Sequence, residues 1–415
     1  MKKTVISFVL WAMVASAAAQ VKVDIILSKG HVIDPATKTD AVRDIAIRDG
    51  VIVKIAPDLS GWKAAKVIAA KGLLVTPGLI DLHTHFFWGS HMDQAYMDGP
   101  NALQPDGFTF RNGVTTAVDA GSSGWKTFPL FKKQTIDNAQ TRILAFLNIV
   151  GEGMRGGKYE QDTADMDARD AAAVAAANPQ DIVGFKVAHY EGHNWVPVDH
   201  AVAASGMVGD TLPVMVDFGG TTPYLPLREL FFDHMRPADI FTHCYAQLGE
   251  TRESIVDTVS GKIPQYVWEA RKRGIIFDVG YGGISFAFSQ AIPAMQQHFY
   301  PNSISTDLHR ESMNAAMKDI LTTMDKFLAM GMPLNEVIAA VTVNPAREIR
   351  HPELGILKEG GCADIALLEL EKGDFRLFDY KGIRLSTDKK LVCKMTIRNG
   401  KIVYDLDGLA YASPN

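Results

Sequence analysis

The sequence predicts an α/β protein, a (β/α)8 TIM-like barrel with a small β-sandwich built from both chain termini. In the middle of the chain, short β-branched or apolar runs alternate with longer helical or loop stretches, which is typical of βα units around a parallel sheet. Both ends instead carry short alternating strands separated by turn signals. A length of 415 residues, with 47% hydrophobic and 21% charged side chains, suits one large barrel with a small satellite.

Residues 1–19 are expected to be a cleaved secretory signal. Lys2 and Lys3 precede an apolar core over residues 5–14, and a run of small residues ends at Ala19, where cleavage is expected. An uncleaved anchor is the alternative, but the core is short for a membrane helix, and no later run reaches the ~18 apolar residues that one needs. The mature protein is therefore expected to be periplasmic or secreted, and free of the membrane.

The strand-rich ends are expected to form one β-sandwich, with residues 20–76 and 351–415 flanking a barrel at residues 77–350. Turn signals at Lys29-Gly30 and Asn399-Gly400 separate the strands. Two unrelated β-extensions are the alternative. The candidate strands of the two ends cover residues 23–27, 31–33, 44–48, 51–55, 364–368, 394–398 and 401–404.

Eight apolar runs in the middle of the chain supply the expected barrel strands. Most of them end in a polar or glycine cluster, which is where barrel enzymes place their chemistry. One helix is expected over residues 312–330, because its apolar residues recur on one face, and another over residues 171–177. The eight runs cover residues 73–80, 115–118, 143–149, 182–187, 214–216, 240–242, 275–279 and 303–305.

Charge and cysteine content narrow the class of partner. A formal net charge of −5 with only short basic clusters argues against nucleic acid. Cys244, Cys362 and Cys393 share no CxxC spacing, so they predict neither a disulfide framework nor a thiolate zinc site. We expect a small-molecule substrate, and a homo-oligomer is left open.

The strongest local signal is the run PGLIDLHTH, from Pro77 to His85. Residues two apart in a strand point to the same face, so the imidazoles of His83 and His85 project together into the barrel mouth. Two neutral imidazoles on one face suit a divalent transition metal, zinc first. A pair of ordinary histidines at a strand end is the alternative, and the preceding run favours the metal site.

This run resembles the first-strand signature of the amidohydrolase superfamily, which comprises metal-dependent barrel hydrolases with a terminal β-sandwich. Other motifs resemble its amidohydrolase/deacetylase branch, which contains acyl-hydrolases related to dihydroorotase-like enzymes, some formerly labelled adenine deaminase or dihydroorotase. The resemblance runs from about residue 30 to residue 404, and the order of the motifs makes it specific. The motifs are VDAGS at 118–122, GFKV at 184–187, THC at 242–244, GGISF at 282–286, SISTDLH at 303–309 and NPA at 344–346.

The resemblance implies further metal ligands on other strands. Lys186 would be carbamylated and bridge two Zn2+ ions, since a carbamate is an anionic two-oxygen ligand whereas an ammonium would repel both cations. A lysine at the barrel rim with its amine in solvent is the alternative. His243 matches a metal ligand, and Asp307 matches the aspartate that contacts one metal and carries the proton between water and leaving group.

Two positions depart from the family pattern. Asp217 ends the fifth candidate strand where the family has histidine. It would ligate zinc through oxygen and shift the second site toward harder metals such as manganese, or the second metal would be weak or absent. Tyr281 stands where relatives of this branch tend to carry histidine.

Loops at the strand ends are expected to contact the substrate. Arg155, Tyr281 and His309 are the candidate substrate-binding residues, and the phenol of Tyr281 would bond a substrate carbonyl or line the pocket. Other polar residues on these loops are His91, Tyr159, His189 and His193.

Together these residues predict a metal-dependent hydrolase that cleaves an acyl amide or ester, deacetylase-like, of an N-acyl amino acid or an O-acetyl hydroxy acid. His83 and His85 would hold one metal, and Asp217 and His243 the other. The metals would lower the pKa of a shared water to about 7 and polarise the scissile carbonyl, while Asp307 would act as the catalytic proton carrier. A cyclic amidohydrolase of the dihydroorotase or hydantoinase type, or a catalytically inactive binding protein on the same barrel, is the alternative.

Overall fold

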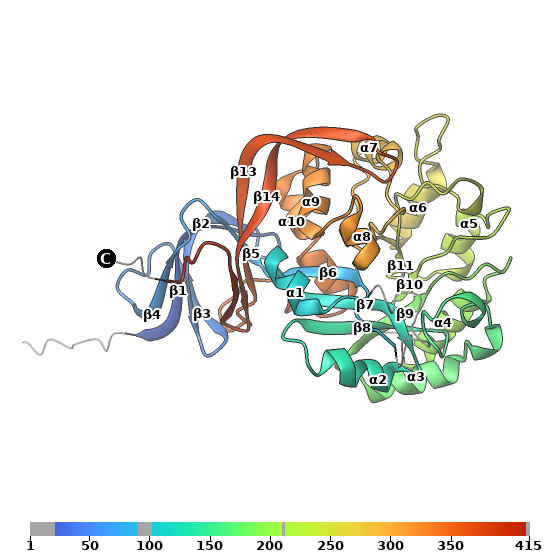
Figure 1. Cartoon of the computed structure of the whole chain (residues 1–415), viewed down its shortest axis with the longest axis horizontal. Helices are drawn as coiled ribbons and strands as arrows, with labels where there is room; N and C mark the ends of the chain where they lie inside the picture. The colour runs from blue at the N-terminus through green and yellow to red at the C-terminus, as the bar shows by residue number, and fades with distance from the viewer. Residues whose placement is uncertain (1–20, 90–101, 210–211, 412–415) are drawn as a thin grey trace, which may run out of the picture.

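The computed structural model describes residues 21–89, 102–209 and 212–411. The expected signal segment and His91 lie outside these residues. Figure 1 shows two bodies: a β-rich body made by the two ends of the chain, and a larger body in which helices surround a curled sheet.

The larger body is built on seven parallel strands in chain order. They are β6 (Leu79–Thr84), β7 (Val114–Gly124), β8 (Arg142–Asn148), β9 (Ile182–Val187), β10 (Val214–Val216), β11 (Ile240–Phe241) and β12 (Ile276–Phe277). The segment from Ser303 to Leu308 closes the sheet: Ser303 forms a parallel bridge with Asp278, next to β12, and Leu308 forms one with Thr84 of β6. The eight segments therefore make a barrel, as expected from the sequence.

Helices follow the strands and cover the outside of this barrel. All six residues of β9 are buried, as a parallel strand covered on both faces requires. The Asp167 side chain accepts bonds from the first backbone N–H groups of the following helix and so fixes its start. The helices are α1 (Pro105–Thr109), α2 (Phe128–Phe131), α3 (Ala168–Ala177), α4 (Val196–Met207), α5 (Leu227–Glu229), α6 (Gln265–Arg273), α7 (Phe288–Gln296), α8 (Arg310–Asn314), α9 (Ile320–Ala329), α10 (Leu334–Ala339) and α11 (Val343–Glu348).

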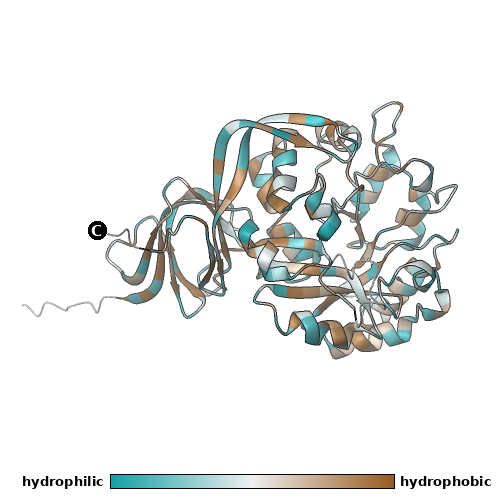
Figure 2. Ribbon diagram, viewed as in Figure 1, coloured by the Kyte–Doolittle hydropathy of each residue, from teal (hydrophilic) through white to brown (hydrophobic). Residues whose placement is uncertain are grey.

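The smaller body combines strands from both ends of the chain. They are β1 (Lys22–Asp34), β2 (Thr39–Arg48), β3 (Val51–Ala56), β4 (Lys63–Ala69), β5 (Leu74–Pro77), β13 (Ile365–Phe378), β14 (Arg384–Arg398) and β15 (Lys401–Asp405). Their order is β15-β14-β13-β5-β1-β2-β3, with β4 paired to β1. Because β13 pairs antiparallel with β5, the C-terminal strands extend the N-terminal sheet. One buried cluster joins Ile47, Val75 and Ile365 between them, and these strands carry both hydrophobic and hydrophilic residues in Figure 2. The expected fold class is confirmed.

β13 and β14 continue beyond this sheet as a long hairpin that reaches over the barrel helices (Figure 1). The backbone N–H of Leu391 donates to the Asp325 carboxylate in α9 at 2.8 Å, and the N–H of Phe288 in α7 donates to Asp379 at 2.9 Å. The sequence suggested only the short ends of these two strands. The hairpin ties the terminal sheet to the side of the barrel that carries α7 and α9.

Two expected strands differ in their bounds. The run at residues 73–80 is not one strand, because it divides at Gly78 into β5 of the terminal sheet and β6 of the barrel. Lys29-Gly30 is not a turn between strands but a bulge inside β1, where the register shifts between Leu27 and Gly30 and Lys29 has a φ of 59°.

The helix expected over residues 312–330 is also interrupted. It separates into α8 and α9, and Lys318 between them has a φ of 66°. Asp319 then accepts a hydrogen bond from the backbone N–H of Thr322 and caps α9. Apolar periodicity on both sides of the break made the two helices look continuous in the sequence.

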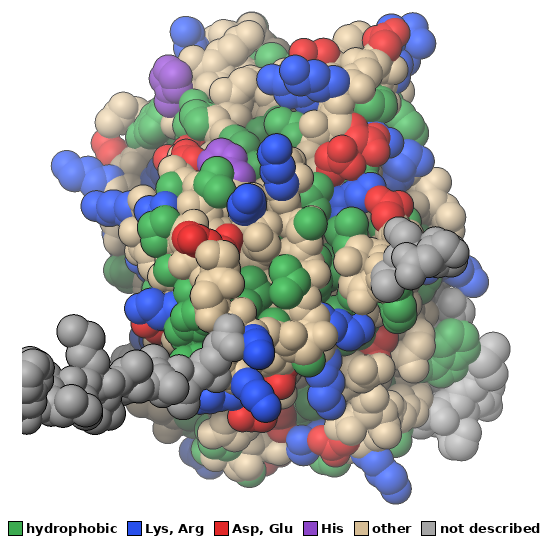
Figure 3. All heavy atoms as spheres, turned by 90° about the vertical axis from the view of Figure 1, so that its left-hand side faces the viewer, with side chains coloured by type: hydrophobic (Ala, Val, Ile, Leu, Met, Phe, Trp, Pro, Cys, Tyr) green, Lys and Arg blue, Asp and Glu red, His purple; other side chains and the backbone are tan. Residues whose placement is uncertain are grey.

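The surface at the terminal-sheet end carries charges of both signs. Figure 3 shows Lys and Arg side chains interspersed with Asp and Glu on that face. Within the described ranges, no helix combines the length and apolar character that crossing a bilayer demands.

Candidate metal centre

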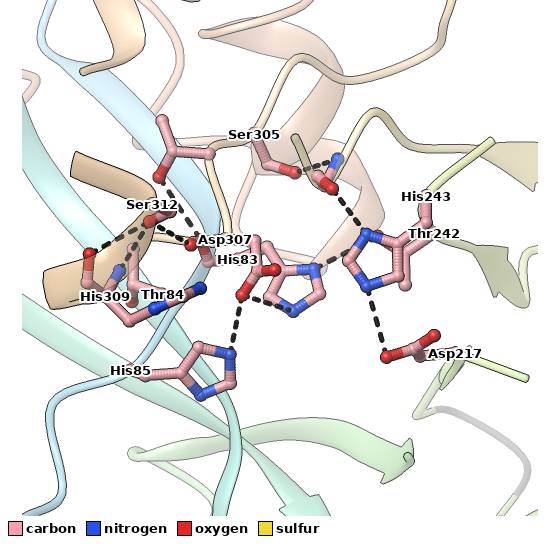
Figure 4. Close-up of polar contacts among 12 residues, drawn as sticks. His83, Thr84, His85, Asp217, Thr242, His243, Ser305, Asp307, His309 and Ser312 are labelled. Atoms are coloured by element: carbon pink, nitrogen blue, oxygen red, sulfur yellow. Dashed lines mark hydrogen bonds and ion pairs between the residues drawn. The ribbon is translucent and has the colours of Figure 1, made fainter. Parts of the chain in front are cut away.

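The first-strand histidines meet the eighth-strand aspartate at the mouth of the barrel. Nε2 of His85 lies 2.9 Å from Oδ1 of Asp307, and Nε2 of His83 lies 3.6 Å from the same oxygen. The donor atoms of these three residues all lie within 4.8 Å of one another. Figure 4 shows the two rings facing the carboxylate from one side. The spacing of two residues at the end of β6, with His83 in the strand and His85 directly after it, therefore places both imidazoles together, as the sequence predicted.

Hydrogen bonds at Nδ1 orient His83 and His243. Nδ1 of His243 contacts the carbonyl oxygen of Gly280, which can only accept a proton. The Thr242 hydroxyl donates to Asp278 at 2.7 Å, so its oxygen is available to accept from Nδ1 of His83 at 3.0 Å. Both rings then carry the proton on Nδ1 and present the Nε2 lone pair to the barrel mouth, which is the orientation that a metal ligand needs.

His85 has the same arrangement on the other side of the site. Its Nδ1 lies 2.9 Å from the hydroxyl of Ser122. Ser122 also donates a hydrogen bond to Asp119, a buried carboxylate that accepts the backbone N–H of Phe86 at 2.8 Å. The Asp119 carboxylate thus orients the His85 imidazole through the Ser122 hydroxyl.

Lys186, the next-to-last residue of β9, lies inside the same site. The residue is fully buried, and its Nζ lies 3.1 Å from Nε2 of His83 and 3.6 Å from the sulfur of Met215. Burial, followed by the charge of Lys186, holds the pKa of His83 well below its usual value, so this imidazole is neutral. Gly121 makes room for the lysine stem, because a Cβ there would collide with the Lys186 side chain.

Asp217 and His243 form the second half of the site. Oδ2 of Asp217 lies 3.1 Å from Nε2 of His243, whereas Oδ1 lies 3.3 Å from the guanidinium of Arg252. Arg252 is buried and also donates to the Thr242 carbonyl at 2.6 Å. Oδ2 therefore faces His243 while the guanidinium compensates the charge of the other oxygen. Arg252 sits in a loop without a motif, so no sequence signal marked it.

Both aspartates are ionised. Burial opposes this, but the neighbouring imidazoles of His83, His85 and His309 hold the pKa of Asp307 well below its usual value. Burial likewise opposes ionisation of Asp217, but the adjacent His243 imidazole and the charge of Lys186 lower the pKa of Asp217 well below its ordinary value.

The backbone is strained at three site residues. His189, His243 and Asp307 have φ values of 54°, 56° and 51°, in the left-handed region that non-glycine residues rarely occupy. Such strain clusters at functional sites, where surrounding contacts hold it. Gly280, with a φ of 45°, packs directly against Thr242. Only glycine fits there, since a Cβ would collide with the Thr242 hydroxyl.

A cavity of about 460 Å³ opens over these groups. Of the three expected substrate-binding residues, His309 lines it, and its buried Nδ1 has no hydrogen-bond partner within the described part of the chain. The Arg155 side chain instead pairs with Glu152 at 3.2 Å. The Tyr281 side chain is fully buried, and its hydroxyl accepts a hydrogen bond from Lys326 at 2.9 Å. Neither Arg155 nor Tyr281 is among the described residues that line this cavity.

The donor set fits a divalent transition metal. His83, His85 and Asp307 supply two imidazole nitrogens and one carboxylate oxygen at the distances above, which is a zinc-type set. Asp217 and His243 line the same cavity as this group, and Lys186 lies buried directly behind it, with its Nζ 3.1 Å from Nε2 of His83. Thr242 and Asp278, which act behind the histidines, were not predicted as site residues although both are polar groups at the ends of buried strands.

Comparison with known proteins shows which family and which structures this chain is similar to. The model of the Amidohydrolase family matches residues 289–403. A curated protein of Brucella anthropi named Deacetylase is 32% identical over 352 residues, which is 83% of each chain. A crystal structure described as an adenine deaminase covers 92% of this chain and 100% of its own, with a TM-score of 0.82 and 27% identity. One described as a dihydroorotase covers 92% and 99%, with a TM-score of 0.79 and 28% identity.

The relatives and the fold agree with the motif order along the strands. Members of the amidohydrolase superfamily are typically dependent on two metals, and a His-His-Asp cluster is present here. The chain therefore belongs to the amidohydrolase family of hydrolases, as the resemblance of its sequence motifs predicted.

Proposed function

We propose that this protein is a metal-dependent hydrolase that cleaves an acyl amide or ester, in the manner of a deacetylase. The observation that carries the proposal is the convergence of His83, His85 and Asp307 within 4.8 Å, with the rings oriented by their Nδ1 contacts. A purely structural cluster would not require Nε2 atoms that all face an open cavity. The donor set suits Zn2+.

The residues of the chain have separate tasks in this reaction. When bound, the metal supplies a lowered water pKa and polarises a carbonyl. Asp307, ionised and at the cavity mouth, accepts the proton of the attacking water and passes it to the leaving group. His309, on the same loop, lines the cavity and contacts the substrate there.

Lys186 is proposed to be carbamylated. A buried ammonium 3.1 Å from a metal-facing imidazole nitrogen would repel a dication. Reaction of the neutral amine with carbon dioxide exchanges that charge for an anionic ligand with two oxygens. The amine contacts His83 and Met215, so it lies inside the ligand cluster rather than in solvent.

A linear acyl substrate is favoured by the relative named Deacetylase, which is similar along most of the chain. Hydrolysis of a cyclic amide is the second candidate, and the similar structure described as a dihydroorotase supports it. The same groups would serve both reactions, because each adds water across a carbonyl.

Metal content and turnover together test the proposal. The purified protein should hold at least about one zinc-type metal per chain, and it should hydrolyse a member of a panel of N-acyl amino acids and O-acetyl hydroxy acids. Dihydroorotate and hydantoins in the same panel distinguish the cyclic alternative. Asp307→Asn should retain metal and lose turnover, whereas Asp388→Asn, at an exposed position of the hairpin, should match the wild type. Full turnover by Asp307→Asn would overturn the role of Asp307, and absence of metal would favour a binding protein.

A further inference from the structure

His189 lies beside the half of the site that lacks its expected histidine. It follows β9, three residues after Lys186, and lines the same cavity. Its Nε2 lies 3.9 Å from Oδ2 of Asp217. That oxygen also faces Nε2 of His243 at 3.1 Å, so the Asp217 carboxylate lies between two imidazoles.

Glu160 orients the His189 ring from behind. Oε1 of Glu160 lies 3.1 Å from Nδ1 of His189, and the carboxylate is almost fully buried, at 1% side-chain exposure. A carboxylate at Nδ1 places the ring proton there and leaves the Nε2 lone pair for the cavity. Metal-binding histidines almost always have such a partner at the ring nitrogen that faces away from the metal. Thr242 is the partner at Nδ1 of His83, and the Gly280 carbonyl is the partner at Nδ1 of His243.

The other oxygen of Glu160 adds a second observation. Oε2 is buried and has no hydrogen-bond partner among the residues that the structure describes. Burying a carboxylate in this way is costly unless the group has a role that retains it. Holding an imidazole toward a cation is such a role, because the cation would strengthen the Nδ1–H bond to the carboxylate.

Two contacts of Oδ2 of Asp217 come near the spacing of two ligands on one metal ion. Two ligands of a tetrahedral zinc, each at about 2.0–2.2 Å, are separated by roughly 3.3–3.5 Å. The His243–Asp217 contact at 3.1 Å is slightly shorter than this, and the His189–Asp217 contact at 3.9 Å is somewhat longer. Among the described residues only His83, His85 and Asp307 have all their ligand atoms within 4.8 Å of one another, so the half-exposed His189 ring has to move toward His243 to share an ion with it.

Charge is balanced at the same place. Replacing a neutral histidine by an aspartate adds one negative charge to a metal site, and the Arg252 guanidinium at 3.3 Å from Oδ1 of Asp217 offsets it. The Asp217–Arg252 pair therefore has the net charge of a histidine.

We propose that His189 is a ligand of the second metal ion, together with Asp217 and His243, and that Glu160 is its positioning residue. The nitrogen ligand missing from the end of β10 is thus supplied from the loop after the neighbouring strand β9. This inference rests on the proposed function, because it assumes a metal at His83 and His85.

Metal titration of the purified full chain tests it without relying on activity. The metal-free protein is reconstituted with Zn2+ or Co2+ in the presence of bicarbonate, and metal per chain is measured after gel filtration. Wild type should hold two ions, and His189→Gln should hold one. His193→Gln is the matched control, since His193 lies on the same loop and its ring faces the Pro223 carbonyl at 3.1 Å, so it should hold two.

Glu160→Gln gives an independent readout. The amide cannot accept as strongly from Nδ1 of His189, so second-ion affinity should fall about 10–100-fold while the first ion is unaffected. The absorption that the second equivalent of Co2+ gives in the wild type should be absent in His189→Gln and altered in Glu160→Gln.

Three results would overturn the assignment of His189. They are two ions with unchanged affinity in His189→Gln, the same loss in His193→Gln, and a wild type that binds a single ion which His189→Gln leaves in place. The last result would leave the hydrolase proposal intact with one metal, whereas a wild type that binds no metal and shows no turnover would contradict both.

Discussion

Nδ1 of His83 lies 3.0 Å from the hydroxyl of Thr242, which in turn donates to Asp278 at 2.7 Å. Asp278 also accepts hydrogen bonds from the hydroxyls of Ser303 and Ser305, each at 2.8 Å or less. A carboxylate in the barrel interior thereby fixes a cavity-lining imidazole through one intervening hydroxyl.

Thr242→Val should weaken binding of the first metal. The valine methyl cannot accept from Nδ1 of His83, so the ring loses the contact that selects its tautomer, and affinity should fall about 10–100-fold. Competition with a chelator measures this, and Thr242→Ser should restore the affinity. Equal metal affinities of Thr242→Val and the wild type would show that the contact from His83 through Thr242 to Asp278 does not support metal binding.

Lys186→Ala should abolish the dependence of metal uptake on bicarbonate. In the wild type, bicarbonate should increase metal content, because carbamylation converts a repelling ammonium into a ligand. Labelled bicarbonate should also give a carbamate signal by carbon NMR in the wild type and none in the variant. Lys126→Ala, which removes a lysine at a surface ion pair, serves as the control. Uptake that is indifferent to bicarbonate would speak against the carbamate.

Arg252→Gln should destabilise the metal-free protein by about 3–5 kcal/mol, because it leaves the buried Asp217 charge without its guanidinium partner. The free energy of unfolding in urea is the measurement. Arg155→Gln should cost about 1 kcal/mol or less, since its partner Glu152 is partly exposed. An equal loss of unfolding free energy in both variants would show that the buried Asp217–Arg252 pair contributes no more to stability than a partly exposed pair.

Glu348→Gln should stabilise the protein increasingly as the pH rises. Burial, followed by the charge of Asp278, raises the pKa of Glu348 to about 8, from its ordinary value of 4.5. Between these two values the folded state binds more protons than the unfolded state, so the wild-type stability contributed by this group falls with rising pH and is lost by pH 8. Glutamine removes this dependence.

Unfolding in urea at a series of pH values from 4 to 9 tests the sign. The difference between Glu348→Gln and wild type should grow through that window to a few kcal/mol, whereas Glu336→Gln, at an exposed position of α10, should show no trend. A difference that does not vary with pH would contradict the raised pKa.

Local pattern was enough to predict the parts of the site that lie on strand ends. His83 and His85 share a face because a strand repeats every two residues, and β9 reads as a continuous apolar run because both of its faces are covered. Asp217 was recognised from the sequence as a departure, and the structure places it beside His243 as expected. The sequence thus determined the fold class, the terminal sheet shared by both ends and the six candidate ligands.

Only the tertiary structure decided which side chains contact and orient those candidate ligands. Arg252, Glu160 and the Thr242–Asp278 relay come from separate loops and strands, and they meet the histidines only after the barrel closes at Ser303 and Leu308. The sequence gives no periodicity for contacts between loops, so their partners depend on how the whole barrel packs. For the same reason the sequence could name Tyr281 and His189 as polar loop residues, but the packing alone turns the first into the core and the second toward Asp217.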